Sequence, residues 1–132
     1  MRKLALATLA LLAPLTAHHA YQLFYAVDQE VILRGRVSSY VFAEPHVMLT
    51  VETKNSGTWK AEWTNPSALR RQGIDQTTLH PGDELEIHGS PALNPAFSVV
   101  SALFDLRRPS DNWHWHRDSA SIQPGNQPRT IE

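Results

Sequence analysis

The sequence predicts an all-β domain, a small five-stranded barrel with one short helix between the third and fourth strands. Three observations support this prediction. Short segments in which apolar and polar residues alternate recur along residues 30–106, and this period of two is typical of half-buried strands. Clusters rich in glycine, proline and asparagine separate these segments and predict turns. One short segment with helix-capping residues follows the third strand, which is the order typical of an OB barrel.

The first three strands are expected over residues 30–42, 47–52 and 58–63. The first is a long β-prone run that contains Gly35, and a glycine inside a strand indicates a bulge or a sharp bend. Residues 54–57 form a turn cluster, so the second and third strands are expected to pair as a hairpin.

A helix is predicted over residues 66–72. Asn65 is a good N-cap, Pro66 suits the first helical position, and Gly73 stands where a C-terminal cap belongs. The last two strands are expected over 84–88 and 97–106. Five short strands also suit an SH3-like barrel or an open sandwich, but the position of the helix favours the OB order.

The chain is expected to have three parts. Residues 1–17 combine a basic start, an apolar run of about a dozen residues and an ending in Ala17, which is typical of a secretory signal peptide. The apolar run is too short to cross a bilayer comfortably, so we expect no stable membrane anchor after cleavage. Residues 18–106 form the barrel domain, and residues 107–132, which are rich in polar residues and proline, are expected to form a flexible tail. The protein is therefore expected to be periplasmic or secreted.

Charge and cysteine content exclude several classes of function. The net charge is −1, and removal of Arg2 and Lys3 with the signal peptide changes it by two, to −3. Without a basic patch, nucleic acid is not an expected partner. The chain has no cysteine, which excludes disulfides, thiol nucleophiles and a lipoprotein anchor. The partner is otherwise unknown, with an envelope protein as one candidate.

Histidines are the main candidates for chemistry. Cleavage after Ala17 would leave a chain that begins His18-His19, with a free α-amine and two imidazoles close together. Such nitrogen-rich ligand sets suit copper(II) and, less well, nickel or zinc. His46 follows Pro45 between the first two strands and is the candidate for a further ligand, with Glu44 beside it as a carboxylate that could orient the ring.

Two alternatives to metal binding remain. The aromatic residues Tyr40, Phe42, Trp59 and Trp63 could line a strand face that binds a protein or a small ligand. For Trp59 and Trp63, core filling is the favoured interpretation, because one face of each strand must be buried. An oxidative copper enzyme ranks last. The sequence has none of the common catalytic motifs, so we expect a binding protein and not an enzyme.

A second histidine cluster lies near the C-terminus, in Trp113-His114-Trp115-His116. Histidines two positions apart share a face only where the chain is extended. The segment is a candidate for binding a metal or a partner. The other interpretation is that its tryptophans pack on the barrel, because large aromatic side chains seek burial.

Taken together, these motifs resemble a family of small periplasmic bacterial proteins of unknown function. The resemblance covers about residues 17–106 and implies an exported OB-like domain without an established activity. It directs attention to His18, His19 and His46, and the chain departs from the family pattern at Ala20 and Glu44. The matching pieces are Ala17-His18-His19, Gly35-Arg36-Val37, Pro45-His46, Trp63, Leu69-Arg70-Arg71-Gln72-Gly73, Pro81-Gly82-Asp83 and Gly89.

Overall fold

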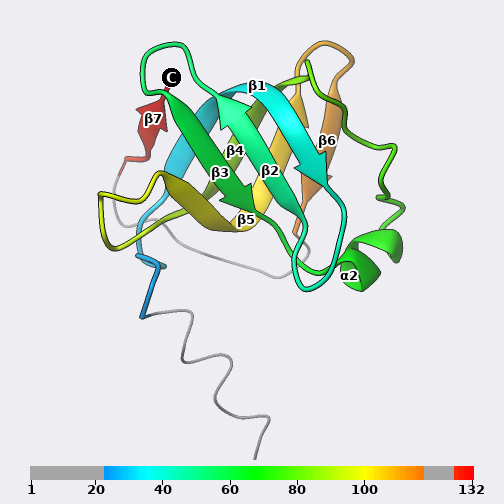
Figure 1. Cartoon of the computed structure of the whole chain (residues 1–132), viewed down its shortest axis with the longest axis horizontal. Coiled ribbons are helices and arrows are strands. Elements are labelled where there is room, and N and C mark those ends of the chain that lie inside the picture. The colour runs from blue at the N-terminus through cyan, green and yellow to red at the C-terminus, as the bar shows by residue number, and fades with distance from the viewer. Residues whose placement is uncertain (1–22, 118–126) are drawn as a thin grey trace, which may run out of the picture.

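The computed structural model describes residues 23–117 and 127–132 and shows a closed five-stranded barrel (Figure 1). The barrel strands pair in the order β1–β2–β3–β5–β4 and back to β1, with only the β3–β5 pair parallel. This closed order, with one helix after β3, confirms the predicted fold class. The elements are β1 (Val31–Val41), β2 (Met48–Glu52), β3 (Thr58–Glu62), α2 (Pro66–Arg70), β4 (Glu84–Pro91), β5 (Val99–Arg108), β6 (Trp113–His116) and β7 (Arg129–Ile131).

Strand β1 bends around the barrel and pairs with β4 along its first half and with β2 along its second. The register shifts between Val37 and Ser39, as expected for a bulge. Gly35 allows the backbone of β2 to approach closely, because a Cβ atom added there would lie 2.4 Å from the carbonyl oxygen of Glu52. The glycine inside this strand is therefore required by packing.

The core fills the inside of the barrel with side chains that alternate along the strands. In β4, Leu85 and Ile87 are buried while Glu84 is exposed, as the period-two pattern predicts. Leu33 of β1 and Leu106 of β5 are also fully buried. The apolar interior fixes which side chains of each strand face outward and are available for binding.

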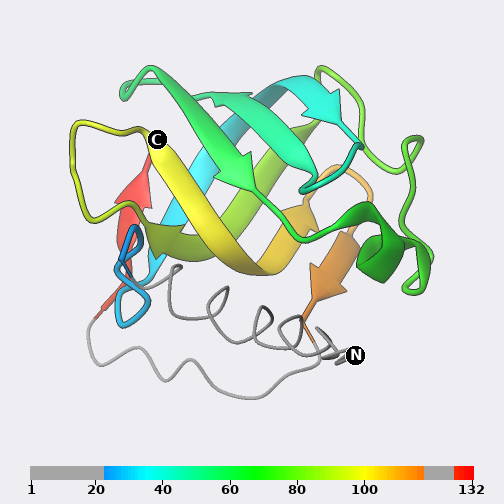
Figure 2. The same ribbon diagram turned by 60° about the horizontal axis from the view of Figure 1, so that its bottom comes forward.

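Helix α2 covers one end of the barrel (Figure 2). Asn65 caps it by accepting a hydrogen bond from the backbone N–H of Ala68 at 2.8 Å, and Pro66 occupies the first turn, as predicted. Leu69 is fully buried against the core. The helix ends at Arg70, two residues earlier than expected, and the chain continues as a turn to Gly73, which has a φ of 77°.

Part of the segment expected to be a flexible tail is instead folded onto the barrel. Strand β6 pairs antiparallel with β5, and β7 pairs parallel with β1. The physical reason lies in two apolar side chains, Trp115 and Ile131, which are 6% and 4% exposed. Within the described residues, no helix is long and apolar enough to cross a membrane.

Candidate functional site

A cleft of about 450 Å³ opens at one end of the barrel. The β1–β2 loop (residues 42–47), the end of β3, the β4–β5 loop (residues 92–98) and the N-terminal segment 23–25 all contribute to it. OB folds use the face of their second and third strands and these same two loops to bind ligands. The residues that line the cleft are Leu23, Phe24, Tyr25, His46, Glu62, Ala92, Leu93, Asn94, Phe97 and Val99.

The polar centre of this cleft is an imidazole–carboxylate pair. Nδ1 of His46 lies 2.5 Å from Oε1 of Glu62. The β2–β3 hairpin positions both residues, because Met48 pairs with Glu62 in the strand register. The backbone pairing continues beyond the strands, where the N–H of Val47 donates to Thr64. His46 therefore follows a fixed backbone, even though it belongs to a loop.

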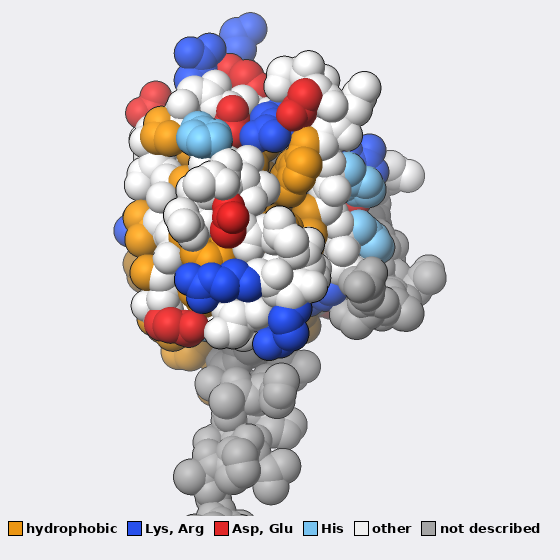
Figure 3. Space-filling view, turned by 90° about the vertical axis from the view of Figure 1, so that its right-hand side faces the viewer, with side chains coloured by type: hydrophobic (Ala, Val, Ile, Leu, Met, Phe, Trp, Pro, Cys, Tyr) orange, Lys and Arg blue, Asp and Glu red, His pale blue; other side chains and the backbone are white. Residues whose placement is uncertain are grey.

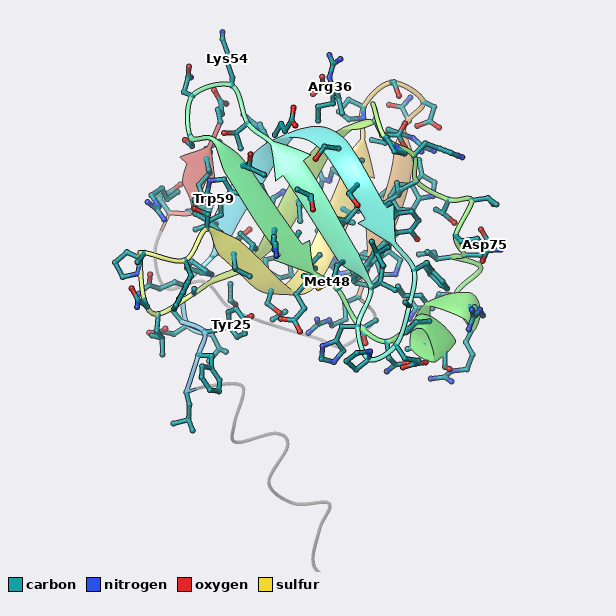
Figure 4. All side chains as sticks on the ribbon, viewed as in Figure 1. Tyr25, Arg36, Met48, Lys54, Trp59 and Asp75 are labelled. Carbon is teal, nitrogen blue, oxygen red and sulfur yellow. The ribbon has the colours of Figure 1, made fainter. Side chains whose placement is uncertain are left out.

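Glu62 is itself held by neighbours from two other parts of the chain. The hydroxyl of Tyr25 donates to Oε2 of Glu62 at 2.8 Å, and the hydroxyl of Ser101 donates to the same oxygen at 3.2 Å. Tyr25 is anchored through a β-bridge to Ala92, the residue that follows β4. Figure 4 shows Tyr25 at the same end of the barrel as Met48, where β2 begins. The carboxylate is thus oriented before any ligand binds.

This arrangement determines which nitrogen of His46 can bind a ligand. A carboxylate accepts hydrogen bonds, so in the neutral imidazole Nδ1 carries the proton and Nε2 carries the free lone pair. The side chain of His46 is 45% exposed, whereas that of Glu62 is 20% exposed. A ring held by a carboxylate, with its other nitrogen accessible, is the arrangement found for histidines that bind metals.

Large apolar side chains surround this polar centre. Leu23, Phe24, Leu93 and Phe97 are all largely exposed, and all four line the same cleft. Scattered exposed apolar residues are common, but several around one cleft indicate a binding surface. The cleft therefore combines an apolar rim with one accessible imidazole.

Of the three predicted metal ligands, the structure describes His46. His46 lies in the cleft, but its carboxylate partner is Glu62, and not Glu44 as the sequence suggested. His18 and His19 lie outside the described residues. Sequence reasoning missed Glu62 and Tyr25, because an outward-facing residue at the end of a strand and a tyrosine in a loop carry no motif.

The four predicted aromatic residues do not form a single binding face. Trp63 is 3% exposed and packs edge to face on Trp115, with ring centroids 4.9 Å apart. Tyr40 donates a hydrogen bond to the backbone carbonyl of Asp75, and burial raises the pKa of its hydroxyl well above the ordinary value. Phe42 packs against the Tyr40 ring at 6.0 Å.

Trp59 lies at the other end of the sheet, where its indole N–H donates to Ser56 at 3.1 Å. Figure 4 shows Trp59 and Asp75 far apart on opposite sides of the barrel. Core packing accounts for Trp63, and the remaining aromatic residues are divided between two places. None of the four lines the cleft at His46.

Comparisons with known proteins identify a family but not an activity. The model of a family of unknown function, DUF6152, matches residues 5–98. No curated protein matches the chain. One solved structure that matches is described as the ZRD-deleted mutant of TiaS in complex with agmatine. It shares 25% sequence identity with a TM-score of 0.46, over 75% of this chain and 24% of the other. The chain thus corresponds to about a quarter of that protein.

Proposed function

The chain belongs to the DUF6152 family of unknown function, and we propose that it is a binding module that takes a divalent transition metal, copper before nickel or zinc, at His46. The observation that carries this proposal is the His46–Glu62 pair at the centre of the cleft. Glu62 fixes the ring and makes its free nitrogen more basic, which strengthens a metal–imidazole bond. Imidazole nitrogens suit copper(II) best among the common divalent ions.

The N-terminal histidines are proposed as the further ligands. Leu23, the first described residue, already lines the cleft. His19 precedes Leu23 by four residues and His18 by five. An extended chain of these lengths reaches about 14 Å and 18 Å, respectively. Cleavage after Ala17 would add the α-amine of His18 to the ligand set. Export to the periplasm, which the signal-like start supports, is part of the same proposal.

The experiment that tests this proposal is a titration of the secreted chain with copper(II), after mass spectrometry has identified its first residue. Copper(II) is paramagnetic, so it broadens the NMR signals of nearby amides and reports which site is occupied. We expect early broadening at Tyr25, Val47 and Glu62. Calorimetry on the same samples should give a dissociation constant below about 1 µM, worth about 8 kcal/mol.

Two variants and one control make the test specific. His46→Ala should weaken copper binding at the cleft by at least tenfold, and Glu62→Gln by about 10–100-fold, because the orienting carboxylate is lost. His80→Ala is the matched control, since His80 is an exposed histidine in a turn away from the cleft. Broadening that is unchanged in His46→Ala would refute the proposal.

A second candidate function rests on the apolar rim. Leu93 and Phe97 are exposed and face the same cleft as His46, so a small amphiphilic molecule could bind there with a polar group on the imidazole. In that case Phe97→Ser would abolish binding of an apolar fluorescent probe, and copper would not compete with the probe. Competition by copper would favour the metal. We assign no catalytic role to these residues.

A further inference from the structure

A second group of metal-binding side chains lies on the outside of the barrel, where β6 pairs with β5. The register places Asp105 opposite His116 and Arg107 opposite His114. Along β6, Trp115 is buried while His114 and His116 are exposed. Because side chains alternate across a strand, both imidazoles project from the outer face. Figure 3 shows histidine side chains gathered near one edge of the molecule, on the side where β6 lies in Figure 1.

These imidazoles converge on one carboxylate oxygen. Nε2 of His114 lies 2.8 Å from Oδ2 of Asp105, and Nδ1 of His116 lies 3.3 Å from the same atom. One atom from each residue can be chosen so that all three lie within 4.8 Å of one another. Tetrahedral bonds of 2.0–2.2 Å require ligand atoms about 3.3–3.6 Å apart. Small side-chain rotations therefore suffice to place all three around one ion.

The carboxylate is more rigidly held than the two rings. The side chain of Asp105 is 9% exposed, against 48% for His114 and 61% for His116. Arg107 donates from Nε to the other oxygen, Oδ1, at 2.9 Å, which leaves Oδ2 facing the imidazoles. A fixed carboxylate with two more exposed rings leaves space for a fourth ligand from solvent.

The neighbouring His88 does not belong to this group. It pairs with Asp105 across β4 and β5, but its two ring nitrogens contact Glu30 at 2.7 Å and Glu86 at 3.0 Å. Its side chain is also largely buried. None of the three residues at the β5–β6 pair lines the cleft at His46.

We propose that Asp105, His114 and His116 form a separate site for one divalent transition metal ion, with water as the fourth ligand. Two nitrogens and one carboxylate oxygen form a ligand set that zinc accepts in proteins with an open coordination position. The site is independent of the cleft, because it shares no residue with it. The proposal assigns a role to the Trp-His-Trp-His segment. The tryptophans pack the strand against the barrel, and the histidines bind the ion.

The test is a zinc titration of the full secreted chain by calorimetry, in four forms: unchanged, His46→Ala, His46→Ala/His114→Ala/His116→Ala, and His80→Ala. Zinc is diamagnetic, so the ring C–H signals of His114 and His116 can be followed by NMR in the same samples. We expect one zinc ion to bind with a dissociation constant below about 10 µM and to shift both signals. Its binding should survive in His46→Ala and His80→Ala.

Because the cleft at His46 is also proposed to accept zinc, the two histidines are replaced in the His46→Ala background, where their loss should weaken zinc binding by at least tenfold. Because both histidines are exposed, the variant should fold, and far-ultraviolet circular dichroism checks that it does. Zinc affinity of the triple variant within threefold of that of His46→Ala would overturn the proposal, as would binding weaker than about 10 µM in the unchanged chain. Loss of zinc binding in His46→Ala alone would assign the ion to the cleft and would also overturn this second site.

Discussion

Replacing Trp115 with alanine should destabilise the whole barrel. The indole is 6% exposed, packs edge to face on Trp63, and donates from Nε1 to Oε1 of Gln72 at 2.7 Å. Burial of an aromatic side chain removes about 150–250 Å² from water, which at about 25 cal/mol per Å² gives about 4–6 kcal/mol. Because the unfolded chain is compact and already buries part of its apolar surface, the expected loss in the free energy of unfolding falls to about 3–5 kcal/mol. This is the range typical of tryptophan-to-alanine changes in cores.

Urea denaturation followed by far-ultraviolet circular dichroism measures this loss in the free energy of unfolding. Trp113→Ala is the matched control, because Trp113 is only partly buried and lies 5.5 Å from the guanidinium of Arg108. We expect the control to lose about 1–2 kcal/mol. A loss below about 1 kcal/mol for Trp115→Ala, or one no larger than the control's, would refute the reasoning that β6 is part of the cooperative fold.

Two further predictions concern the strands on either side of the core. Gly35→Ala should lower the thermal midpoint and reduce the free energy of unfolding by about 1–3 kcal/mol, because the new Cβ would meet the carbonyl oxygen of Glu52. An unchanged midpoint would contradict this prediction. For Asp105, burial alone would raise the pKa, but hydrogen bonds from His114 and Arg107 outweigh it and hold the pKa below the ordinary value of 3.8. A carboxyl with a lowered pKa stabilises the fold above pH 3.8, and this stability is lost as the pH falls through the lower folded value. Stability measured between pH 6 and pH 2 should therefore fall less steeply in Asp105→Asn, and identical slopes would argue against this contribution.

The barrel could be predicted because each of its strands carries its own signal. Leu85 and Ile87 alternate with polar residues, and the Asn65-Pro66 cap identifies the helix. Strands β6 and β7 could not be predicted in the same way. Each is held largely by one apolar side chain, Trp115 or Ile131, and a single buried residue in a polar segment has no periodicity to detect.

The candidate site at the cleft could be predicted only in part. His46 stands out because it follows a proline at the start of a strand. Its partner Glu62 depends on the register of the β2–β3 hairpin, in which Met48 faces Glu62. A shift of one residue would move the carboxylate to the other face of the sheet. The sequence predicted the hairpin and its turn but not this register, so it offered Glu44, the nearer carboxylate along the chain.

The two proposed sites depend on strand register to different degrees. For this reason, the sequence could predict more of the residues at one site than at the other. At the β5–β6 pair, His114 and His116 are two positions apart, so an extended chain is enough to place both rings on one face. Only Asp105 requires knowledge of the pairing. At the cleft, the ligand and its orienting carboxylate are 16 positions apart, and Tyr25 comes from a third part of the chain. Local spacing can therefore identify a ligand pair, whereas a carboxylate that orients a ligand across strands becomes visible only when the strands are paired.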